Sequence, residues 1–268
     1  MLFIVSVAAA LVGTAAATAI DYRHSSFSCP IHAVSCVNYT VPVNSCCTEL
    51  KGGLMMITEL WQSGTPQNGP DDKWTIHGLW SDYCVGGDWP QFCEPDRMLN
   101  NTVVDVLTQA GEHQLLKDMD KYWLGSNGTA SNAPFWEHEW NKHGTCMTTL
   151  EPSCLPSSKH TNHTDAVTFY KTVVGLYKRF DFYKALKAHN IVPSDKPYKT
   201  QDVSDAIESY FGNIPNIQCF DGAISAIWIY FHVEGNVATG NYVPTIPDSP
   251  GNCNDTLLYP VKVIGPGF

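Results

Sequence analysis

Apolar and polar side chains alternate along four short stretches of the chain, and a period of two is typical of β-strands. Two of these stretches lie early in the sequence and two lie near its end. The third ends at a turn over residues 234–236, which we expect to lead into a short returning segment at residues 237–238. The predicted strands are residues 54–61, 74–80, 223–233 and 257–263.

In the middle of the chain the apolar residues recur every three or four positions, which is the period of an amphipathic helix. Gly212 is placed to end the last of these helices, and Asn101 or Thr102 is placed to cap the first. Residues 126–134 are polar, and we expect a flexible loop there. The predicted helices are residues 103–116, 135–143, 165–180, 182–189 and 202–211. Strands at both ends with helices between them favour a single α+β domain with a central antiparallel sheet.

The size and composition of the chain fit one domain preceded by a leader. Residues 2–16 are apolar and uncharged, and small residues follow them, so residues 1–19 resemble a secretory signal peptide that is removed. No later stretch approaches the roughly 18 apolar residues of a membrane span, and we expect no membrane partner. Residues 20–268 show no linker or repeat, and a hydrophobic content of 44% is enough for one core.

The cysteines and glycosylation motifs indicate an oxidising compartment. The chain has 10 cysteines, and in a secreted protein this number predicts five disulfides rather than metal thiolates, although spacing alone leaves the pairing open. Asn-x-Ser/Thr motifs are acceptors of N-linked glycans in the secretory route. They occur at Asn38, Asn100, Asn127, Asn162 and Asn254. We therefore predict a secreted protein, with retention in a vacuole or lysosome as the alternative.

The formal net charge is −10, and the first twenty residues contribute none of it. A protein that holds nucleic acid by its phosphates needs a basic surface, so this charge argues against a stable nucleic-acid binder. An enzyme that releases its substrate needs positive charge only locally. If histidines supply that charge, several must be protonated together, and we expect an acidic pH optimum because free histidine titrates at about pH 6.5.

The predicted helix at residues 135–143 combines ionisable and aromatic side chains. At about 100° per residue, these side chains form one stripe and a polar flank beside it. The stripe contains Trp136, Glu139, Trp140 and His143, and the flank contains Phe135, His138 and Lys142. A polar arc bordered by indoles predicts a site for acid–base chemistry, although a buried helix whose polar groups satisfy one another gives the same pattern. Gly144 is placed to end the helix, and Cys146 is placed to fix that end covalently.

A zinc site is the alternative for this helix. The zinc-protease motif His-Glu-x-x-His puts two imidazoles one turn apart. Here His138 and His143 are five residues apart, which separates them by about 140° around the helix. The pair four residues apart is Glu139 and His143. We therefore expect these two residues to act as an acid–base pair, with no metal and no cofactor.

A second motif lies on the predicted strand at residues 74–80, where His77 stands in the middle and Gly78 permits close backbone approach. The sequence Ile-His-Gly-Leu-Trp at residues 76–80 and the sequence His-Glu-Trp-x-Lys-His-Gly-Thr-Cys at residues 138–146 resemble the two signature segments of the ribonuclease T2 family. Because the two segments together fix more than ten residue identities, the resemblance is specific.

The resemblance implies how these residues divide the chemistry of RNA cleavage. RNA carries its own nucleophile, the 2′-hydroxyl, so cleavage needs a base, an acid and a cation beside the crowded phosphorus. By family position His143 is the base, His77 is the acid, Glu139 and Lys142 assist around the phosphorane, and His138 holds the phosphate. These roles imply a metal-independent endoribonuclease that forms a 2′,3′-cyclic phosphate and hydrolyses it slowly to a 3′-phosphate.

Base-binding residues are also implied by family position. Trp80 would stack on the primary base, and Asp82 would accept a hydrogen bond from its exocyclic amine. Trp89 stands near a loop position that is tyrosine in fungal members, and Phe135 is a candidate for the second base. Glu59 stands where a glutamine of the second base site is expected, which puts the base preference in doubt. Because every base can stack on an aromatic ring, we expect low base specificity.

The resemblance to fungal members further implies a disulfide pairing that spacing could not choose. The Cys93–Cys146 bond would clamp the end of the helix that carries His143. The implied pairs are Cys29–Cys47, Cys36–Cys84, Cys46–Cys154, Cys93–Cys146 and Cys219–Cys253.

Two classes of function therefore remain. The main prediction is a secreted, monomeric endoribonuclease whose partner is single-stranded RNA. The alternative is a secreted binding or immunomodulatory protein that retains the fold. A pure binder has no need to keep His77, Glu139 and His143 together, whereas this chain has all three.

Overall fold

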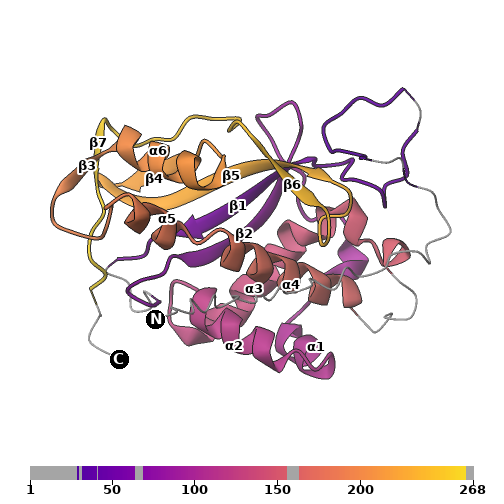
Figure 1. Ribbon diagram of the computed structural model, residues 1–268. Helices are drawn as coiled ribbons and strands as arrows, with labels where there is room; N and C mark the ends of the chain where they lie inside the picture. The colour runs from indigo at the N-terminus through magenta and orange to yellow at the C-terminus, as the bar shows by residue number, and fades with distance from the viewer. Residues whose placement is uncertain (1–28, 30–31, 41, 64–68, 156–162, 264–268) are drawn as a thin grey trace, which may run out of the picture.

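A seven-stranded sheet forms the centre of the protein in the computed structural model, which describes residues 29, 32–40, 42–63, 69–155 and 163–263 (Figure 1). The strand order is β2-β1-β5-β7-β3, and β4 and β6 also pair with β5. All pairs are antiparallel except a parallel bridge between β5 and β7. The strands are β1 (Leu54–Leu60), β2 (Thr75–Asp82), β3 (Pro197–Lys199), β4 (Asn216–Phe220), β5 (Ala223–Glu234), β6 (Asn241–Thr245) and β7 (Thr256–Leu258).

Helices cover one face of the sheet, and the main core lies between the helices and that face. In Figure 1 α1 to α4 lie below the sheet, whereas α5 and α6 lie near β3 and β7. The helices are α1 (Val103–Gln109), α2 (His113–Tyr122), α3 (Asn132–Lys142), α4 (Thr164–Arg179), α5 (Phe182–Ala188) and α6 (Thr200–Phe211). This arrangement confirms the predicted α+β fold with an antiparallel sheet.

The long strand β5 shows why the sheet has two different faces. Ile227, Ile229 and Phe231 point into the main core, whereas Trp228 and Tyr230 belong to a small apolar cluster on the opposite face. This alternation follows from the two-residue period of a strand. The second face therefore presents aromatic side chains that the helices do not cover.

The helix predicted at residues 103–116 is two helices, because the chain breaks at Gly111. Gly111 has a φ of 75°, in the left-handed region that only glycine adopts easily. The predicted cap position is correct, because Thr102 is the N-cap residue of α1, but its side chain makes no capping hydrogen bond. Instead the Glu137 carboxylate of α3 accepts hydrogen bonds from the backbone N–H groups of Thr102 and Val103 at 2.5 and 2.9 Å.

The segment expected as a loop at residues 126–134 contributes the start of α3, which begins at Asn132. Pro134 is tolerated in its first turn because the N–H groups there have no partner within the helix. The helix ends at Lys142, but Gly144 does not adopt a left-handed conformation. A Cβ at Gly144 would lie 2.3 Å from the Trp140 ring, so this glycine permits close packing instead.

The ends of the sheet differ most from the prediction. The returning segment expected at residues 237–238 belongs to a wider turn, and the returning strand is β6. The strand predicted at residues 257–263 is only β7, since Pro260 lacks the N–H that a longer ladder needs. The sequence showed no pattern for β3 and β4. β3 has only three residues, which is too short for a period to appear.

All five predicted disulfide pairs are present. The bonds join Cys29 to Cys47, Cys36 to Cys84, Cys46 to Cys154, Cys93 to Cys146 and Cys219 to Cys253. Asn38, Asn100, Asn127 and Asn254 are exposed, whereas Asn162 and the predicted leader at residues 1–19 lie outside the described residues. Within the described parts of the chain, no helix is both long enough and apolar enough to cross a membrane.

Candidate active site

His77 lies at a β-bulge in the edge strand β2. Gly78 pairs with Thr58 and Ile76 pairs with Glu59, so His77 has no partner in the β1 register. Because of this extra residue, Ile76 and Leu79 both enter the main core although they are three residues apart. Bulges commonly redirect one side chain out of the regular alternation. Here the bulge turns the His77 imidazole towards Trp80, at 4.6 Å between ring centroids.

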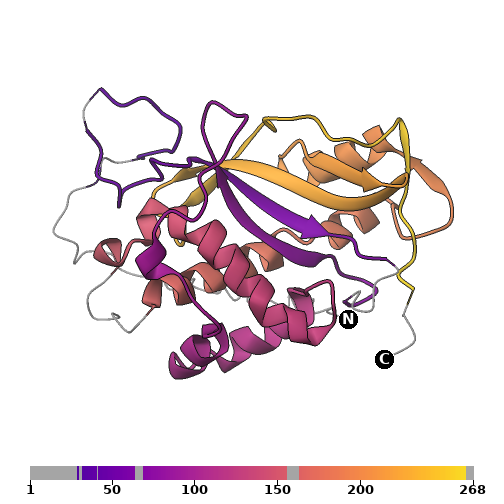
Figure 2. The same ribbon diagram turned by 180° about the vertical axis from the view of Figure 1, so that it is seen from behind.

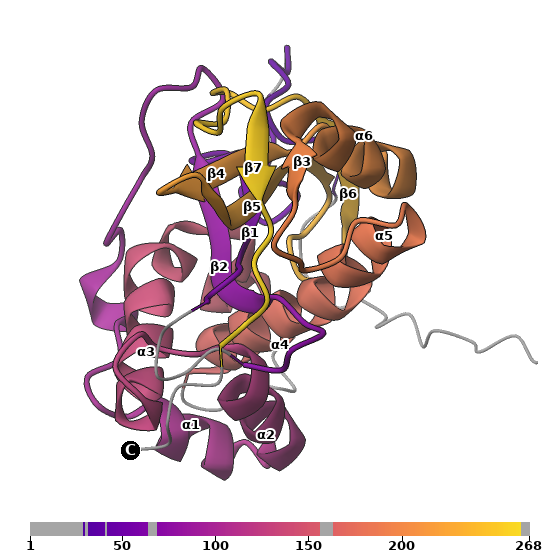
Figure 3. The ribbon, with the colours of Figure 1, turned by 90° about the vertical axis from the view of Figure 1, so that its left-hand side faces the viewer.

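The C-terminal half of α3 faces this bulge. Figure 2 shows α3 (pink) alongside the first two strands (violet), and Figure 3 shows it beside β2 at the edge of the sheet. The Trp80 indole N–H donates to the Glu139 carboxylate at 2.7 Å, and the Trp80 ring stacks on His143 at 5.0 Å. Glu139 also lies 3.8 Å from the His77 Nε2 atom. One indole therefore contacts both histidines and orients the carboxyl group.

The expected Glu139–His143 pair does not form. Among the described residues the Glu139 carboxyl contacts His77 and Trp80 instead, and no ion pair joins it to His143. The Nδ1 atom of His143 is buried and has no hydrogen-bond partner among these residues. The physical reason is the helix end, since His143 follows the last residue of α3 and its ring turns onto Trp80.

Burial shifts the pKa of each of these three groups towards the neutral form. Burial, together with the positive charges of His138 and Lys142, lowers the pKa of His77 to about 4. Burial and the charges of Lys142, His138 and His77 lower the pKa of His143 further, to about 2. Burial raises the pKa of Glu139 to about 8, although the Trp80 hydrogen bond and Lys142 oppose this shift. Burial therefore favours a neutral Glu139 carboxyl and neutral His77 and His143 imidazoles at pH values between about 4 and about 8.

Covalent and ionic contacts fix the end of α3 that carries His143. The Cys93–Cys146 disulfide attaches this end to the loop after β2. Arg97 donates to the Thr145 carbonyl at 3.1 Å and forms an ion pair with Asp165 at 2.8 Å. Since a catalytic imidazole must stay within a fraction of an ångström of its working position, such anchors on several sides are expected.

The other residues predicted for phosphate and the second base lie around this centre. Phe135 packs on His77, at 5.6 Å between ring centroids. His138 is exposed, yet its charge acts on both His77 and His143. Lys142 extends towards Trp89, with the ammonium group 5.9 Å from the ring centroid. Glu59 of β1 lies apart from these residues. Its side chain is buried on the face of the sheet that the helices cover.

A cavity of about 470 Å³ opens beside His143 on the second face of the sheet. It contains three of the predicted base-binding residues, Trp80, Asp82 and Trp89, whereas Phe135 is not part of its lining. Sequence reasoning missed seven further residues of its wall. They are Met56, Gly87, Asp88, Trp228, Tyr230, Asp248 and Ser249. Trp228 and Tyr230 are two residues apart on a predicted strand, so their shared face was a usable signal, whereas Asp248 lies in a loop and gave none.

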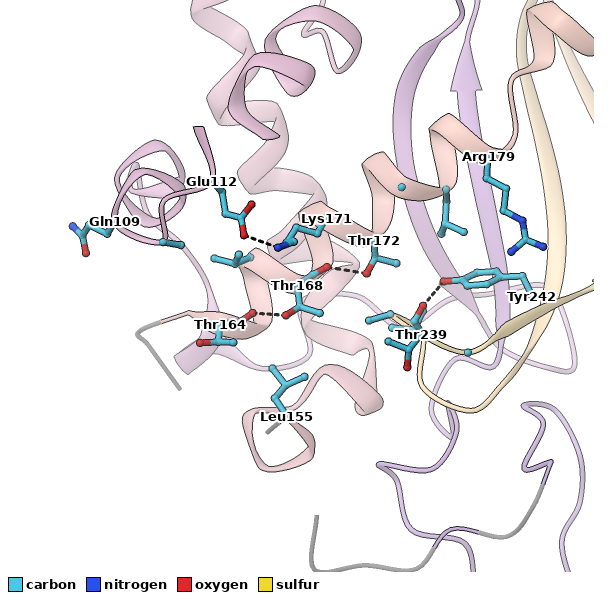
Figure 4. Close-up of a pocket in the computed structure, with 17 residues that line it drawn as sticks. Gln109, Glu112, Leu155, Thr164, Thr168, Lys171, Thr172, Arg179, Thr239 and Tyr242 are labelled. Atoms are coloured by element: carbon cyan, nitrogen blue, oxygen red, sulfur yellow. Dashed lines mark hydrogen bonds and ion pairs between the residues drawn. The ribbon is translucent and has the colours of Figure 1, made fainter. Parts of the chain in front are cut away.

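A larger cavity of about 760 Å³ lies between α4 and the turn before β6 (Figure 4). Its described wall contains Lys171, which pairs with Glu112, and a row of threonines, but no histidine. It therefore lacks the acid–base groups found beside Trp80. No set of three metal-binding side chains comes together in the part of the chain that the structure describes.

The bulged edge strand and the helix bring two imidazoles to one indole next to an aromatic cavity, an arrangement that can exchange protons with a bound substrate. Residues 43–242 match the model of the Ribonuclease T2 family. The chain is 41% identical over 236 residues to "Ribonuclease T2" of Aspergillus oryzae, which covers 87% of this chain and 83% of that protein. It is 38% identical over 221 residues to "Ribonuclease M" of Aspergillus phoenicis, and the alignment covers 81% of this chain and 91% of that protein. The chain belongs to the ribonuclease T2 family and is an RNA endonuclease.

Solved structures agree with this assignment. The fold matches the crystal structure of Actibind, described as a T2 ribonuclease, with a TM-score of 0.80, 36% identity, and coverage of 86% of this chain and 96% of that one. Human RNase T2 matches with a TM-score of 0.55 and 24% identity over 78% of this chain and 97% of that one, which shows the shared fold alone.

Proposed function

We propose that the protein cleaves single-stranded RNA without a metal ion, through a 2′,3′-cyclic phosphate that is then hydrolysed to a 3′-phosphate. The observation that carries this proposal is the contact of His77 and His143 with one indole, that of Trp80, at 4.6 and 5.0 Å between ring centroids. The two imidazoles come from different elements, so a phosphodiester placed at Trp80 would have one proton acceptor and one proton donor. The substrate supplies its own 2′-hydroxyl nucleophile, and no covalent enzyme intermediate is needed.

The order of the two histidine pKa values supports the assignment of their roles. A base must be unprotonated and an acid protonated at the same pH, so the base needs the lower pKa. The pKa of His143 is lowered to about 2 and that of His77 to about 4. His143 is therefore suited to accept the 2′-hydroxyl proton, and His77 to protonate the leaving 5′-oxygen.

Glu139 and Lys142 complete the proposed site. With its pKa raised to about 8, the Glu139 carboxyl is neutral in acid and donates a hydrogen bond to a phosphoryl oxygen. Lys142 supplies positive charge for the extra negative charge of the phosphorane. The exposed His138 adds a second cation when protonated, which suits a residue that holds the phosphate.

The positions of the aromatic residues support an orientation for the substrate. The cavity beside His143 would take the base of the nucleotide whose 2′-hydroxyl attacks the phosphorus. Phe135, which packs on His77, would stack on the base that follows the cleaved bond. We expect the five disulfides to form during secretion, after removal of residues 1–19, and residues 20–268 to act as a monomer.

The proposal is tested by digesting single-stranded ribohomopolymers at about pH 5 in EDTA and following the phosphorus products by NMR. We expect a 2′,3′-cyclic phosphate to appear before the 3′-phosphate, with no effect of EDTA. Single-stranded DNA, which has no 2′-hydroxyl, serves as the uncleaved control. Products with 5′-phosphates, or a loss of activity in EDTA, would contradict the mechanism.

The same assay tests the two histidines. His77→Ala and His143→Ala should each lower kcat by about 10² to 10⁴, the usual contribution of a general acid or base. His113→Ala is the matched control, because His113 is exposed at the start of α2. Near-normal turnover in either active-site variant would exclude that histidine as a proton-transfer group.

A further inference from the structure

Phe92, in the loop after β2, is an exposed aromatic residue in a backbone conformation that such residues rarely adopt. Its φ is 50°, in the left-handed region, and 45% of its surface is exposed. A bulky side chain is strained in this region, where glycine is the usual residue. The ring belongs to neither apolar cluster of the described residues, so packing in the core does not account for the strain. Backbone strain of this kind is concentrated at functional sites.

The chain around Phe92 is attached to the end of α3. The Phe92 N–H donates to the Lys142 carbonyl at 3.0 Å, and the next residue, Cys93, forms the disulfide with Cys146. The Cys93 N–H also donates to the Thr145 hydroxyl at 3.2 Å. These three attachments fix the position of the aromatic ring beside α3 without burying the ring itself.

The same loop carries two exposed aromatic rings past the polar flank of α3. The Phe92 ring lies beside His138, with 6.3 Å between ring centroids and an angle of 75° between the ring planes. Trp89, which is 43% exposed, lies beside the ammonium group of Lys142, one helical turn further along α3. Trp89 belongs to the wall of the base cavity, whereas Phe92 does not. The second ring is therefore available to a ligand that extends beyond the cavity.

Trp89 and Phe92 are close enough for two neighbouring nucleotides of one strand. Three residues of extended chain span at most about 11 Å. Neighbouring bases of single-stranded RNA can be splayed apart and stack on separate aromatic rings. In the orientation proposed above, one base lies in the cavity next to Trp89, and the base after the cleaved bond lies on Phe135. The nucleotide that precedes the one in the cavity is therefore the nucleotide left for Phe92.

We propose that Phe92 forms a third base subsite, on which the nucleotide on the 5′ side of the one in the cavity stacks. The proposal rests on the proposed cleavage of RNA and extends the substrate to single strands of at least three nucleotides. Because stacking needs only the face of a base, this subsite accepts any base. The phosphate that joins the two nucleotides would lie towards the positive charge of Lys142, which separates the two rings along α3.

The test uses short substrates that contain a single ribonucleotide, so that only one bond can be cleaved. The dinucleotide A-dA has no additional nucleotide, dA-A-dA has one on the 5′ side, and A-dA-dA has one on the 3′ side. A further trinucleotide carries an abasic residue in place of the 5′ dA and keeps the additional phosphate without its base. For the wild-type protein we expect kcat/KM of dA-A-dA to exceed that of the abasic trinucleotide by about 5- to 100-fold, the range for stacking one base on an aromatic ring.

Three variants assign this ratio to the Phe92 ring. Phe92→Gly removes the ring, and glycine adopts the left-handed φ without strain, so the ratio should fall to about one in a loop of unchanged conformation. Phe92→Tyr keeps an aromatic ring and should keep the wild-type ratio. Phe220→Ala removes another exposed aromatic ring, at the end of β4, and should also keep it. A general effect on folding or on His138 alters kcat/KM of both trinucleotides and cancels in the ratio.

Equal kcat/KM values of the two trinucleotides in the wild-type protein, with normal cyclic phosphate formation, would overturn the inference and leave the proposed function intact. A Phe92→Gly ratio equal to the wild-type ratio would overturn the role of Phe92. A gain that depends on Phe92 for A-dA-dA, and not for dA-A-dA, would overturn the assignment to the 5′ side. Absence of cyclic phosphate from every substrate would overturn the proposed function and the inference together.

Discussion

Gly78 shows how closely β2 and α3 approach each other. A Cβ built on Gly78 would lie 2.1 Å from the Glu139 carboxylate and 2.9 Å from the Trp80 indole nitrogen. Its φ is not positive, so the backbone itself permits other residues here. The glycine is therefore needed for space, and any side chain would push α3 away from β2.

Gly78→Ala should lower kcat by at least about tenfold, because a shift of one ångström in a catalytic group commonly has a large effect on rate. The matched control is Gly175→Ala on α4, where an added Cβ meets no atom within 4 Å. This control should keep full activity and raise the free energy of unfolding by about 0.5–1 kcal/mol through helix propensity. Steady-state kinetics and thermal unfolding of both variants test the prediction. Equal activity of the two variants would contradict it.

At the residue scale the sequence indicated which ionisable residues lie together better than it indicated their contacts. His77, Glu139 and His143 all contact Trp80, but the helical spacing suggested a Glu139–His143 pair that does not form. Side-chain direction at a helix end is set by packing on Trp80, which no local pattern encodes. Asp248 was missed for the same reason, since only the fold brings its loop to the cavity.

At the scale of elements, α3 does more than carry the site, because it also caps α1. The Glu137 carboxylate accepts backbone hydrogen bonds from Asn101, Thr102 and Val103, with donor–acceptor distances of 2.8, 2.5 and 2.9 Å. A carboxylate at a helix N-terminus satisfies free N–H groups and interacts favourably with the helix dipole. The helices α3 and α1 are thus connected by one side chain, that of Glu137.

Glu137→Gln should therefore lower the free energy of unfolding by about 0.5–2 kcal/mol, the range measured for loss of a helix cap. We expect kcat to stay close to that of the wild type, because Glu137 makes no contact with His77 or His143 in the described structure. Glu112→Gln breaks an exposed ion pair with Lys171 and should cost no more than about 1 kcal/mol. The test is to measure the free energy of unfolding of both variants by chemical denaturation and to compare it with their kcat values. A large loss of activity in Glu137→Gln without a loss of stability would count against a purely structural role.

Helices and long strands were predictable because their periods extend over many residues, as in α4, α6 and β5. Breaks within a period were less visible. Gly111 interrupts an otherwise continuous apolar pattern by adopting a positive φ, and Pro260 ends β7 early. The bulge at His77 has no signature in the alternation itself, since it appears only when β1 supplies the register.

The whole molecule has a net charge of −10, whereas Lys142 places a positive charge beside His77 and His143. Several surface lysines are neutralised by carboxylates, as in the pairs Lys171–Glu112 and Lys178–Asp118. The active site instead concentrates Lys142 and three histidines beside the proposed phosphate position. RNA is then attracted at one place and repelled elsewhere, which favours release of the product.

This distribution of charge, with burial, predicts an acidic optimum for activity. His77 must be protonated to act as the acid, and its pKa is lowered to about 4, so kcat/KM should fall as the pH rises towards neutrality. His143 stays unprotonated over the same range because its pKa is lowered further, and Glu139 stays neutral below about pH 8. We expect kcat/KM to be largest below neutrality, measured on one dinucleotide at constant ionic strength.

The pH dependence of kcat should be shifted to higher pH relative to that of kcat/KM. A bound phosphate brings negative charge next to His77 and raises its pKa, so kcat should fall at higher pH than kcat/KM does. Lys142→Gln removes a positive charge that lowers the pKa of His77, so its kcat/KM should also fall at higher pH than that of the wild type, at a reduced maximum. A kcat/KM maximum above about pH 7.5 would contradict the assignment of His77, with its lowered pKa, as the general acid.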